Sequence, residues 1–174
     1  NEYLDFILKE VELVKKVLQE SNVLISKDEE IKVINHYKKL MSIENNIKNL
    51  HTMNMVSLEI HNVANNVPNK YSITDKADGE RYFLFIFFNK IYLISYNLEI
   101  KNTNLKLPAN LIEYNNTILD GEYILLKKYN KYLFATFDIL FYKGKDVRKI
   151  DSLENRMDLL RDVTNKLNFK FNFE

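Results

Sequence analysis

The chain contains no cysteine and no tryptophan, and only three glycines and two prolines occur among its 174 residues. The absence of cysteine excludes disulfides, a thiol nucleophile and a cysteine-ligated zinc site, and it fits a reducing compartment. No apolar run approaches the length of a membrane-spanning helix, so no membrane partner is expected. Because glycine is so scarce, Gly79, Gly121 and Gly144 are each expected to meet a need of the backbone.

The charge of the chain is nearly balanced at +1, and 46% of its residues are hydrophobic. This composition suits one domain with a real core, and it lacks the strong positive charge of a dedicated nucleic-acid-binding protein. Two lysine pairs, Lys127-Lys128 and Lys143 with Lys145, could contact nucleic-acid phosphates, but we interpret them as solvated turns. The chain begins with Asn1 rather than Met, so we expect it to be a piece of a longer polypeptide.

The first third of the chain has the apolar spacing of helices. Residues 1–20 predict an amphipathic helix, and a second helix is expected to begin near Ser26 and to continue towards Leu50. Ser26 and Glu29 have the spacing of a capping box at the start of that helix. We therefore predict that residues 1–66 form a helical N-terminal segment or an inter-domain junction.

Beyond residue 66 the apolar pattern changes to that of strands. Asn89-Lys90 is predicted to form a two-residue hairpin turn, and residues 151–167 are predicted to form a last helix. Together these signals predict an α+β fold, in which residues 67–174 form an antiparallel sheet preceded by the helical segment. The expected strands cover residues 71–75, 82–88, 91–96, 117–127 and 132–142.

The most informative run is Thr74-Asp75-Lys76-Ala77-Asp78-Gly79-Glu80-Arg81. A lysine amine attacks an electrophile only when neutral, so the pKa of Lys76 must be lowered by burial or by nearby positive charge. Its position between a strand and a turn could hold it rigidly at the edge of the sheet. Gly79 would let the backbone approach a ligand closely, and Arg81 could bind ribose or phosphate oxygens. Alone, this short pattern is equally consistent with a polar turn.

Two further segments place carboxylates inside apolar strands. Strand alternation puts Asp120 and Glu122 on one face, where they need a cation, a metal ion or a ribose hydroxyl as partner. Asp138 lies between Phe137 and Ile139, and a buried carboxylate at this position requires a counter-charge, for which Lys76 or a bound metal is the expected partner. The alternative for both segments is a half-exposed sheet whose polar face is in water.

The three segments, in this order, resemble the motifs of covalent nucleotidyltransferases, the superfamily of mRNA capping guanylyltransferases and ATP-dependent DNA ligases. The resemblance covers residues 67–165 and includes Arg156, which matches an arginine that opens a helix after the third motif. It implies that Lys76 forms a lysyl-N-phosphate bond with a nucleotide, and that Mg²⁺ or Mn²⁺ is bound by Glu122 and Asp138. It also implies a nucleotide-binding role for Thr74, Asp75, Asp78, Gly79, Arg81 and Glu122.

Smaller features favour capping enzymes over ligases. Ligases of this superfamily typically carry Glu two residues before the lysine, whereas this chain has Thr74, so the resemblance implies GTP as substrate. The run 71–81 looks most like capping enzymes of large cytoplasmic DNA viruses. That likeness implies 5′-diphosphate RNA as acceptor, fused or associated RNA triphosphatase and cap methyltransferase modules, and a location in the cytoplasm, a viral factory or the virion.

Two alternatives remain open at this point: an ATP-dependent polynucleotide ligase, and a non-catalytic nucleotidyltransferase-like scaffold. The later motifs of the superfamily and its C-terminal OB-fold module are not found in the sequence. We therefore expect this chain to hold only part of the nucleotidyltransferase domain, and to be weakly active or inactive by itself.

Overall fold

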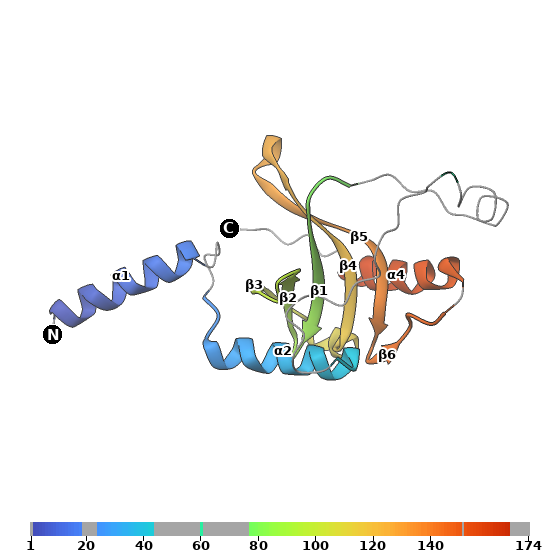
Figure 1. Cartoon of the computed structure of the whole chain (residues 1–174), viewed down its shortest axis with the longest axis horizontal. Helices are drawn as coiled ribbons and strands as arrows, with labels where there is room; N and C mark the ends of the chain where they lie inside the picture. Colours follow the sequence, from blue (N-terminus) through green and yellow to red (C-terminus); the bar gives the residue numbers. More distant parts are fainter. Residues whose placement is uncertain (1, 19–23, 44–59, 61–76, 151, 168–174) are drawn as a thin grey trace.

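The described part of the chain is built around one antiparallel sheet. A computed structural model describes residues 2–18, 24–43, 60, 77–150 and 152–167 (Figure 1). Its six strands lie in the order β3-β2-β1-β4-β5-β6. They are β1 (Glu80–Phe87), β2 (Lys90–Ser95), β3 (Ile100–Lys106), β4 (Thr117–Leu126), β5 (Lys131–Tyr142) and β6 (Lys145–Asp146). The α+β antiparallel fold expected from the sequence is therefore confirmed.

Helices cover both faces of the sheet. Helix α2 (Lys27–Met41) and helix α4 (Leu153–Leu167) pack on opposite faces, and the 3₁₀ helices η1 (Ala109–Tyr114) and η2 (Lys127–Tyr129) occupy connections. The core under α2 contains Val33, Tyr37, Met41, Phe83, Phe85, Phe87, Ile94 and Ile118. The core under α4 contains Ile86, Leu119, Ile139, Leu160 and Val163. Because apolar surface is buried on both faces, the central strands are held rigidly.

The start of α2 is fixed by its cap and by the sheet. The Ser26 hydroxyl accepts a hydrogen bond from the Glu29 backbone N–H at 3.2 Å, as the capping box predicts. The Glu29 carboxylate does not turn back to the cap; it accepts from Lys90 Nζ and Tyr92 Oη of β2, both at 2.6 Å. The helix ends at Met41, where Ser42 adopts a left-handed conformation with φ of 55°, so α2 is shorter than the predicted helix, and residues 44–50 lie outside the described residues.

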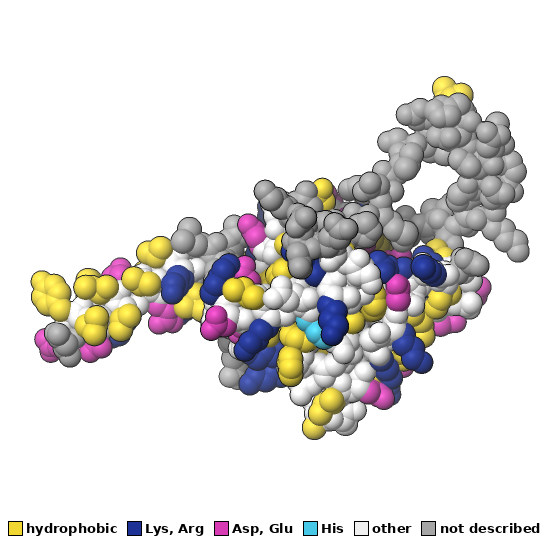
Figure 2. Space-filling model, turned by 60° about the horizontal axis from the view of Figure 1, so that its bottom comes forward, with side chains coloured by type: hydrophobic (Ala, Val, Ile, Leu, Met, Phe, Trp, Pro, Cys, Tyr) yellow, Lys and Arg dark blue, Asp and Glu magenta, His cyan; other side chains and the backbone are white. Residues whose placement is uncertain are grey.

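Helix α1 (Glu2–Leu18) forms as its periodicity predicts, but its apolar stripe is exposed. Leu4, Ile7, Val11 and Val14 are all more than 40% exposed, and Figure 2 shows hydrophobic side chains along this helix at the left of the view. Among the described residues, no helix is long and apolar enough to cross a membrane. The predicted boundary between residues 66 and 67 lies outside the described residues, and α2, from the predicted helical segment, shares a core with the sheet.

The strands of the sheet agree with the sequence in position, and they differ in two details. The first hairpin turns at Phe88-Asn89, whose φ values are 47° and 59°, and not at Asn89-Lys90. Strands β3 and β6 were not predicted: β3 is mostly polar and, within the described sheet, pairs only with β2, and β6 has two residues. The predicted strand at 71–75 lies outside the described residues, and the last predicted helix is confirmed as α4.

Candidate active site

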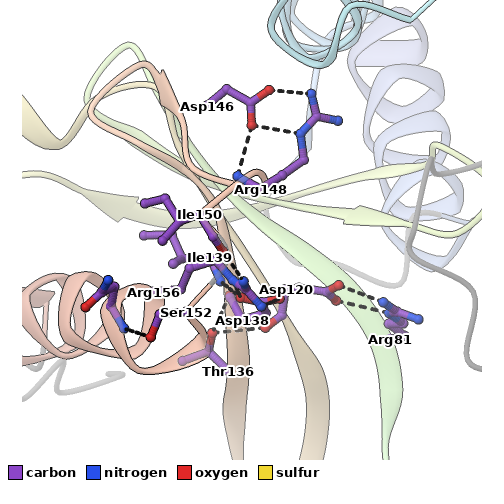
Figure 3. Close-up of polar contacts among 11 residues, drawn as sticks. Arg81, Asp120, Thr136, Asp138, Ile139, Asp146, Arg148, Ile150, Ser152 and Arg156 are labelled. Carbon is purple, nitrogen blue, oxygen red and sulfur yellow. Dashed lines mark hydrogen bonds and ion pairs between the residues drawn. The ribbon is translucent and has the colours of Figure 1, made fainter. Parts of the chain in front are cut away.

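Two of the sequence-predicted motifs meet where β1 begins. Arg81 on β1 binds the Asp120 carboxylate on β4 through two hydrogen bonds, Nε to Oδ1 at 3.0 Å and Nη2 to Oδ2 at 2.7 Å (Figure 3). The Asp120 side chain is only 6% exposed, whereas that of Arg81 is 27% exposed. Burial raises the pKa of Asp120 above its ordinary value, and the hydrogen bonds from Arg81 oppose this effect. The arginine head is therefore fixed in direction and still accessible to a ligand.

A second contact joins the same two motifs. The Gly79 backbone N–H donates to Glu122 Oε2 at 2.8 Å, and Arg81 lies opposite Glu122 in the β1–β4 register. That register is continuous, so Asp120 and Glu122 lie on one face of β4, as strand alternation predicts. A Cβ on Gly79 would lie 2.7 Å from the Tyr123 carbonyl oxygen. The contact that requires glycine here is thus with β4, and the expected close approach to a ligand stays a prediction.

The third motif has an arginine as the counter-charge of its carboxylate in the described part of the chain. Asp138 on β5 lies opposite Asp120, and its Oδ1 accepts from Arg156 Nε at 3.0 Å (Figure 3). Arg156 also donates through Nη1 to the Ile150 carbonyl at 2.8 Å, so this arginine ties the start of α4 to β5 through Asp138 and to the segment before the helix through Ile150. The sequence indicated Lys76 or a metal ion as partner; Lys76 lies outside the described residues, and the described partner is Arg156. The sequence feature that indicates this pairing is an arginine near the start of the helix that follows a strand with one buried aspartate.

Two bulges in β5 shape this part of the sheet. Phe137 and Leu140 have no partner on β4, because the register shifts at both positions. The guanidinium carbon of Arg81 lies 5.6 Å from the centre of the Phe137 ring, so the first bulge supplies an aromatic contact to the site. Gly121 faces the same region, where an added Cβ would lie 2.7 Å from the Ala135 carbonyl oxygen. Glycine is therefore needed for β4 to approach β5 beside the bulge.

Two hollows adjoin the start of β1. The first, of about 410 Å³, is lined by Asp78, Gly79 and Lys101, and by Tyr123 and Tyr132 of the β4–β5 hairpin. The second, of about 800 Å³, includes Arg81 and Tyr96 in its lining. Both include Glu80 and Lys101. The residues of the first predicted motif that the structure describes thus lie at the edge of open space large enough for a nucleotide.

Three residues of the first predicted motif, Thr74, Asp75 and Lys76, lie outside the described residues. Within the described ranges, no group of three or more His, Asp or Glu side chains could hold a metal ion. Asp78, Gly79, Arg81, Glu122 and Asp138 are described. Asp78 and Gly79 directly precede β1, and Arg81 on β1 lies opposite Glu122 on β4, whereas Asp138 lies on β5.

A six-stranded antiparallel sheet that joins these motifs is consistent with part of a nucleotidyltransferase domain. Residues 16–172 match the sequence model of the family described as "mRNA capping enzyme, catalytic domain". The chain belongs to this family.

A viral relative supports the same assignment. The chain is 37% identical over 152 residues to a protein of Acanthamoeba polyphaga mimivirus described as "Probable mRNA-capping enzyme". The match covers 86% of this chain and 13% of the mimivirus protein. The resemblance to viral capping enzymes inferred from the motifs is therefore confirmed, and the chain spans only a small part of the length of this relative.

Proposed function

We propose that the protein containing this chain is an mRNA guanylyltransferase that works through a covalent lysine adduct. Lys76, as the neutral amine, attacks the α-phosphorus of GTP; the N–P bond forms, the bond from that phosphorus to the oxygen bridging to the β-phosphate breaks, and pyrophosphate leaves. The terminal phosphate oxygen of a 5′-diphosphate RNA then attacks the same phosphorus and displaces Lys76. The products are GMP-capped RNA and the free lysine.

The observation that carries this proposal is the junction of the first two motifs. Arg81 is held by Asp120 and Gly79 by Glu122, so the segment that follows Lys76 has a fixed position on β4. A rigid support of this kind lets a nucleophile meet its target in one orientation, which is a large part of catalysis by positioning. Asp78 and Gly79 line the hollow of about 410 Å³, where they would contact the bound nucleotide.

Arg81 would act on the nucleotide and not on the attacking amine. Its guanidinium is a permanent cation, and Asp120 uses only part of its five N–H donors. The remaining donors would bind ribose or phosphate oxygens of GTP. Thr74 and Asp75 complete the proposed nucleotide-binding set, and Thr74 in place of a glutamate favours GTP over ATP.

A divalent cation is proposed as cofactor. Mg²⁺ or Mn²⁺ would neutralise charge on the triphosphate and so make the α-phosphorus easier to attack. Such hard cations prefer oxygen ligands, and the Glu122 carboxylate, oriented by the Gly79 N–H, fits that preference. Asp138 is the weaker of the two proposed ligands, because Arg156 already binds its carboxylate.

The proposed partners follow from the capping reaction. The acceptor would be 5′-diphosphate RNA, whose supply requires removal of the terminal phosphate from 5′-triphosphate RNA. RNA triphosphatase and cap methyltransferase modules are therefore proposed in the same polypeptide or in a complex, at a site of viral mRNA synthesis such as the cytoplasm. The much greater length of the mimivirus relative supports a multi-module protein.

Covalent labelling tests the proposal. The full-length protein would be incubated with Mg²⁺ or Mn²⁺ and with GTP or ATP labelled at the α-phosphate, and label that stays on the protein after denaturation in SDS at neutral or alkaline pH would be measured. We expect label from GTP that is lost in Lys76→Ala and kept in Lys39→Ala, which alters an exposed lysine of α2. Label from ATP alone would indicate a polynucleotide ligase, and no label from a folded protein would leave a non-catalytic scaffold.

A further inference from the structure

The hairpin formed by β4 and β5 extends beyond the rest of the described sheet. Pairing of β1 with β4 ends at Glu80 and Tyr123, whereas β4 and β5 stay paired as far as Leu126 and Lys131. Residues 124–133 therefore pair only with each other within the described ranges, and Figure 1 shows this hairpin projecting from the sheet. We call residues 124–133 the hairpin arm.

The hairpin arm concentrates positive charge in a chain whose net charge is only +1. No acidic residue occurs between Glu122 and Asp138, and the arm carries Lys127, Lys128 and Lys131. All three lysines are exposed. A local excess of three positive charges, against a net charge of +1 for the whole chain, attracts a polyanion to this element in particular.

Aromatic rings lie beside these lysines. Tyr129 and Tyr132 are 61% and 55% exposed, and Lys128 Nζ lies 5.5 Å from the centre of the Tyr129 ring. The Tyr132 ring stacks on that of Tyr123 with centroids 4.6 Å apart and an angle of 1° between the planes. Exposed tyrosines interleaved with lysines are the combination that binds single-stranded nucleic acid, because bases stack on the rings while lysines meet the phosphates.

The hairpin arm and the nucleotide motifs line the same hollow. The space of about 410 Å³ is lined by Asp78 and Gly79 of the first motif together with Tyr123 and Tyr132 of the β4–β5 hairpin. Lys101 also lines it, and its Nζ lies 5.4 Å from the ring centre of Tyr82. A strand bound along the arm would therefore reach the residues that follow the proposed nucleophile.

From this arrangement we propose that the hairpin arm binds the single-stranded 5′ region of the RNA that accepts GMP. The inference rests on the proposed function for the identity of the acceptor, and on the lysines and tyrosines of the arm for the surface. It replaces the interpretation of Lys127-Lys128 as a solvated turn. Lys127, Lys128 and Lys131 contact phosphates, and Tyr129 stacks on a base.

Direct RNA binding tests the surface. The full-length protein, a Lys127→Ala/Lys128→Ala/Lys131→Ala variant and a Tyr129→Ala variant would be titrated with a short fluorescent single-stranded 5′-diphosphate RNA at several salt concentrations. We expect the triple variant to bind at least about ten-fold more weakly, and the slope of log K against log salt to fall by about 2, since each lost phosphate contact removes about 0.7. We expect Tyr129→Ala to weaken binding several-fold without changing that slope.

A matched control variant loses the same number of positive charges at positions outside the hairpin arm. Lys39, Lys106 and Lys149 are exposed and lie outside the arm, so their triple alanine variant should bind RNA as the wild type does. Equal weakening in both triple variants would overturn the proposal, because it would show a general charge effect. The proposal would also be overturned if both arm variants bound RNA as the wild type does. It would be overturned as well if the arm variants lost binding to anionic vesicles or to a protein while their binding to RNA stayed unchanged.

The two steps of the reaction separate this inference from the proposed function. Formation of enzyme–GMP uses no RNA and reports whether the nucleotide site is intact, whereas transfer to RNA requires the acceptor surface. We expect the arm variants to raise the KM for RNA in the transfer step. If the wild type forms no enzyme–GMP, the proposed function fails while the RNA titration still decides the role of the arm.

Discussion

Asp120 and Asp138 lie directly opposite each other on β4 and β5, and a different arginine binds each carboxylate. Asp138 raises the pKa of Asp120 by charge repulsion, although burial is the larger cause. Arg81 from β1 and Arg156 from α4 compensate the two negative charges. The candidate site is thus electrostatically connected to α4, on the opposite side of the sheet from α2.

Arg156→Met should destabilise the fold, because it leaves the Asp138 carboxylate without its counter-charge. The side chains of this pair are 13% and 11% exposed, and removing one partner of such a pair costs about 3 kcal/mol. Urea unfolding gives the change in free energy. Arg161→Met is the matched control, since Arg161 and Asp158 form an exposed pair on the same helix; a similar loss in both variants would contradict this account.

Arg81→Met should raise the pKa of Asp120 further above its ordinary value of 3.8, because the two contributions of Arg81 that lower it are lost. A carboxyl whose pKa is raised on folding favours the protonated form, so the folded state loses stability as pH rises through that pKa. The deficit of the variant relative to the wild type should therefore be larger at neutral pH than below the ordinary pKa. The free energy of unfolding of both proteins, measured across this pH range, checks the sign of the change. With Asp120→Asn present in both proteins, the difference between them should no longer depend on pH.

Gly79→Ala should impair formation of enzyme–GMP strongly, although the substitution adds only one methyl group. The added Cβ would meet Tyr123 O and Ile124 Cγ1 at 2.7 Å, and the backbone shift that relieves this would break the bond from Gly79 N to Glu122. Overpacking of this kind costs about 1–3 kcal/mol. Gly144→Ala serves as comparison, because its φ of +80° makes alanine strained in the turn between β5 and β6. Enzyme–GMP labelling should fall strongly only with Gly79→Ala.

Alkaline pH should weaken the contact between η1 and α4. Tyr114 Oη and Tyr142 Oη both donate to Asp162 Oδ2 at 2.7 Å, and burial followed by the Asp162 carboxylate raises the pKa of Tyr114 from 10.0 to about 12. A raised tyrosine pKa contributes stability that is complete below the ordinary value and is lost as pH rises towards the folded value. Unfolding free energy should thus fall between pH 10 and about 12, with a smaller fall in Tyr114→Phe.

The sequence predicts the elements of this fold better than their contacts. Apolar periodicity finds β1, β2, β4 and β5 because each has a buried face, whereas β3 has only two buried residues, Ile100 and Asn102, among polar ones. The first turn is misplaced by one residue because Phe88, an aromatic with positive φ, carries no turn signal. The pairing of Phe87 with Lys90 places the turn at Phe88-Asn89.

The site shows the same division. Asp120 and Glu122 are placed on one face correctly, since the period of a strand is a local property. The partner of Asp138 depends on how α4 docks, and the need for glycine at position 79 depends on how close β4 lies. Both are set by tertiary packing, which cannot be predicted from a pattern along the chain.

The strand order has a consequence for assembly. Every pairing in the described sheet joins strands that follow each other along the chain, except that between β1 and β4. The sheet is thus two meanders, each able to form from local contacts, which meet along one seam, and Arg81 lies on one side of that seam while Asp120 and Glu122 lie on the other. The site comes into existence only when the meanders dock, so a nucleotide that contacts both sides would hold them together and slow their separation.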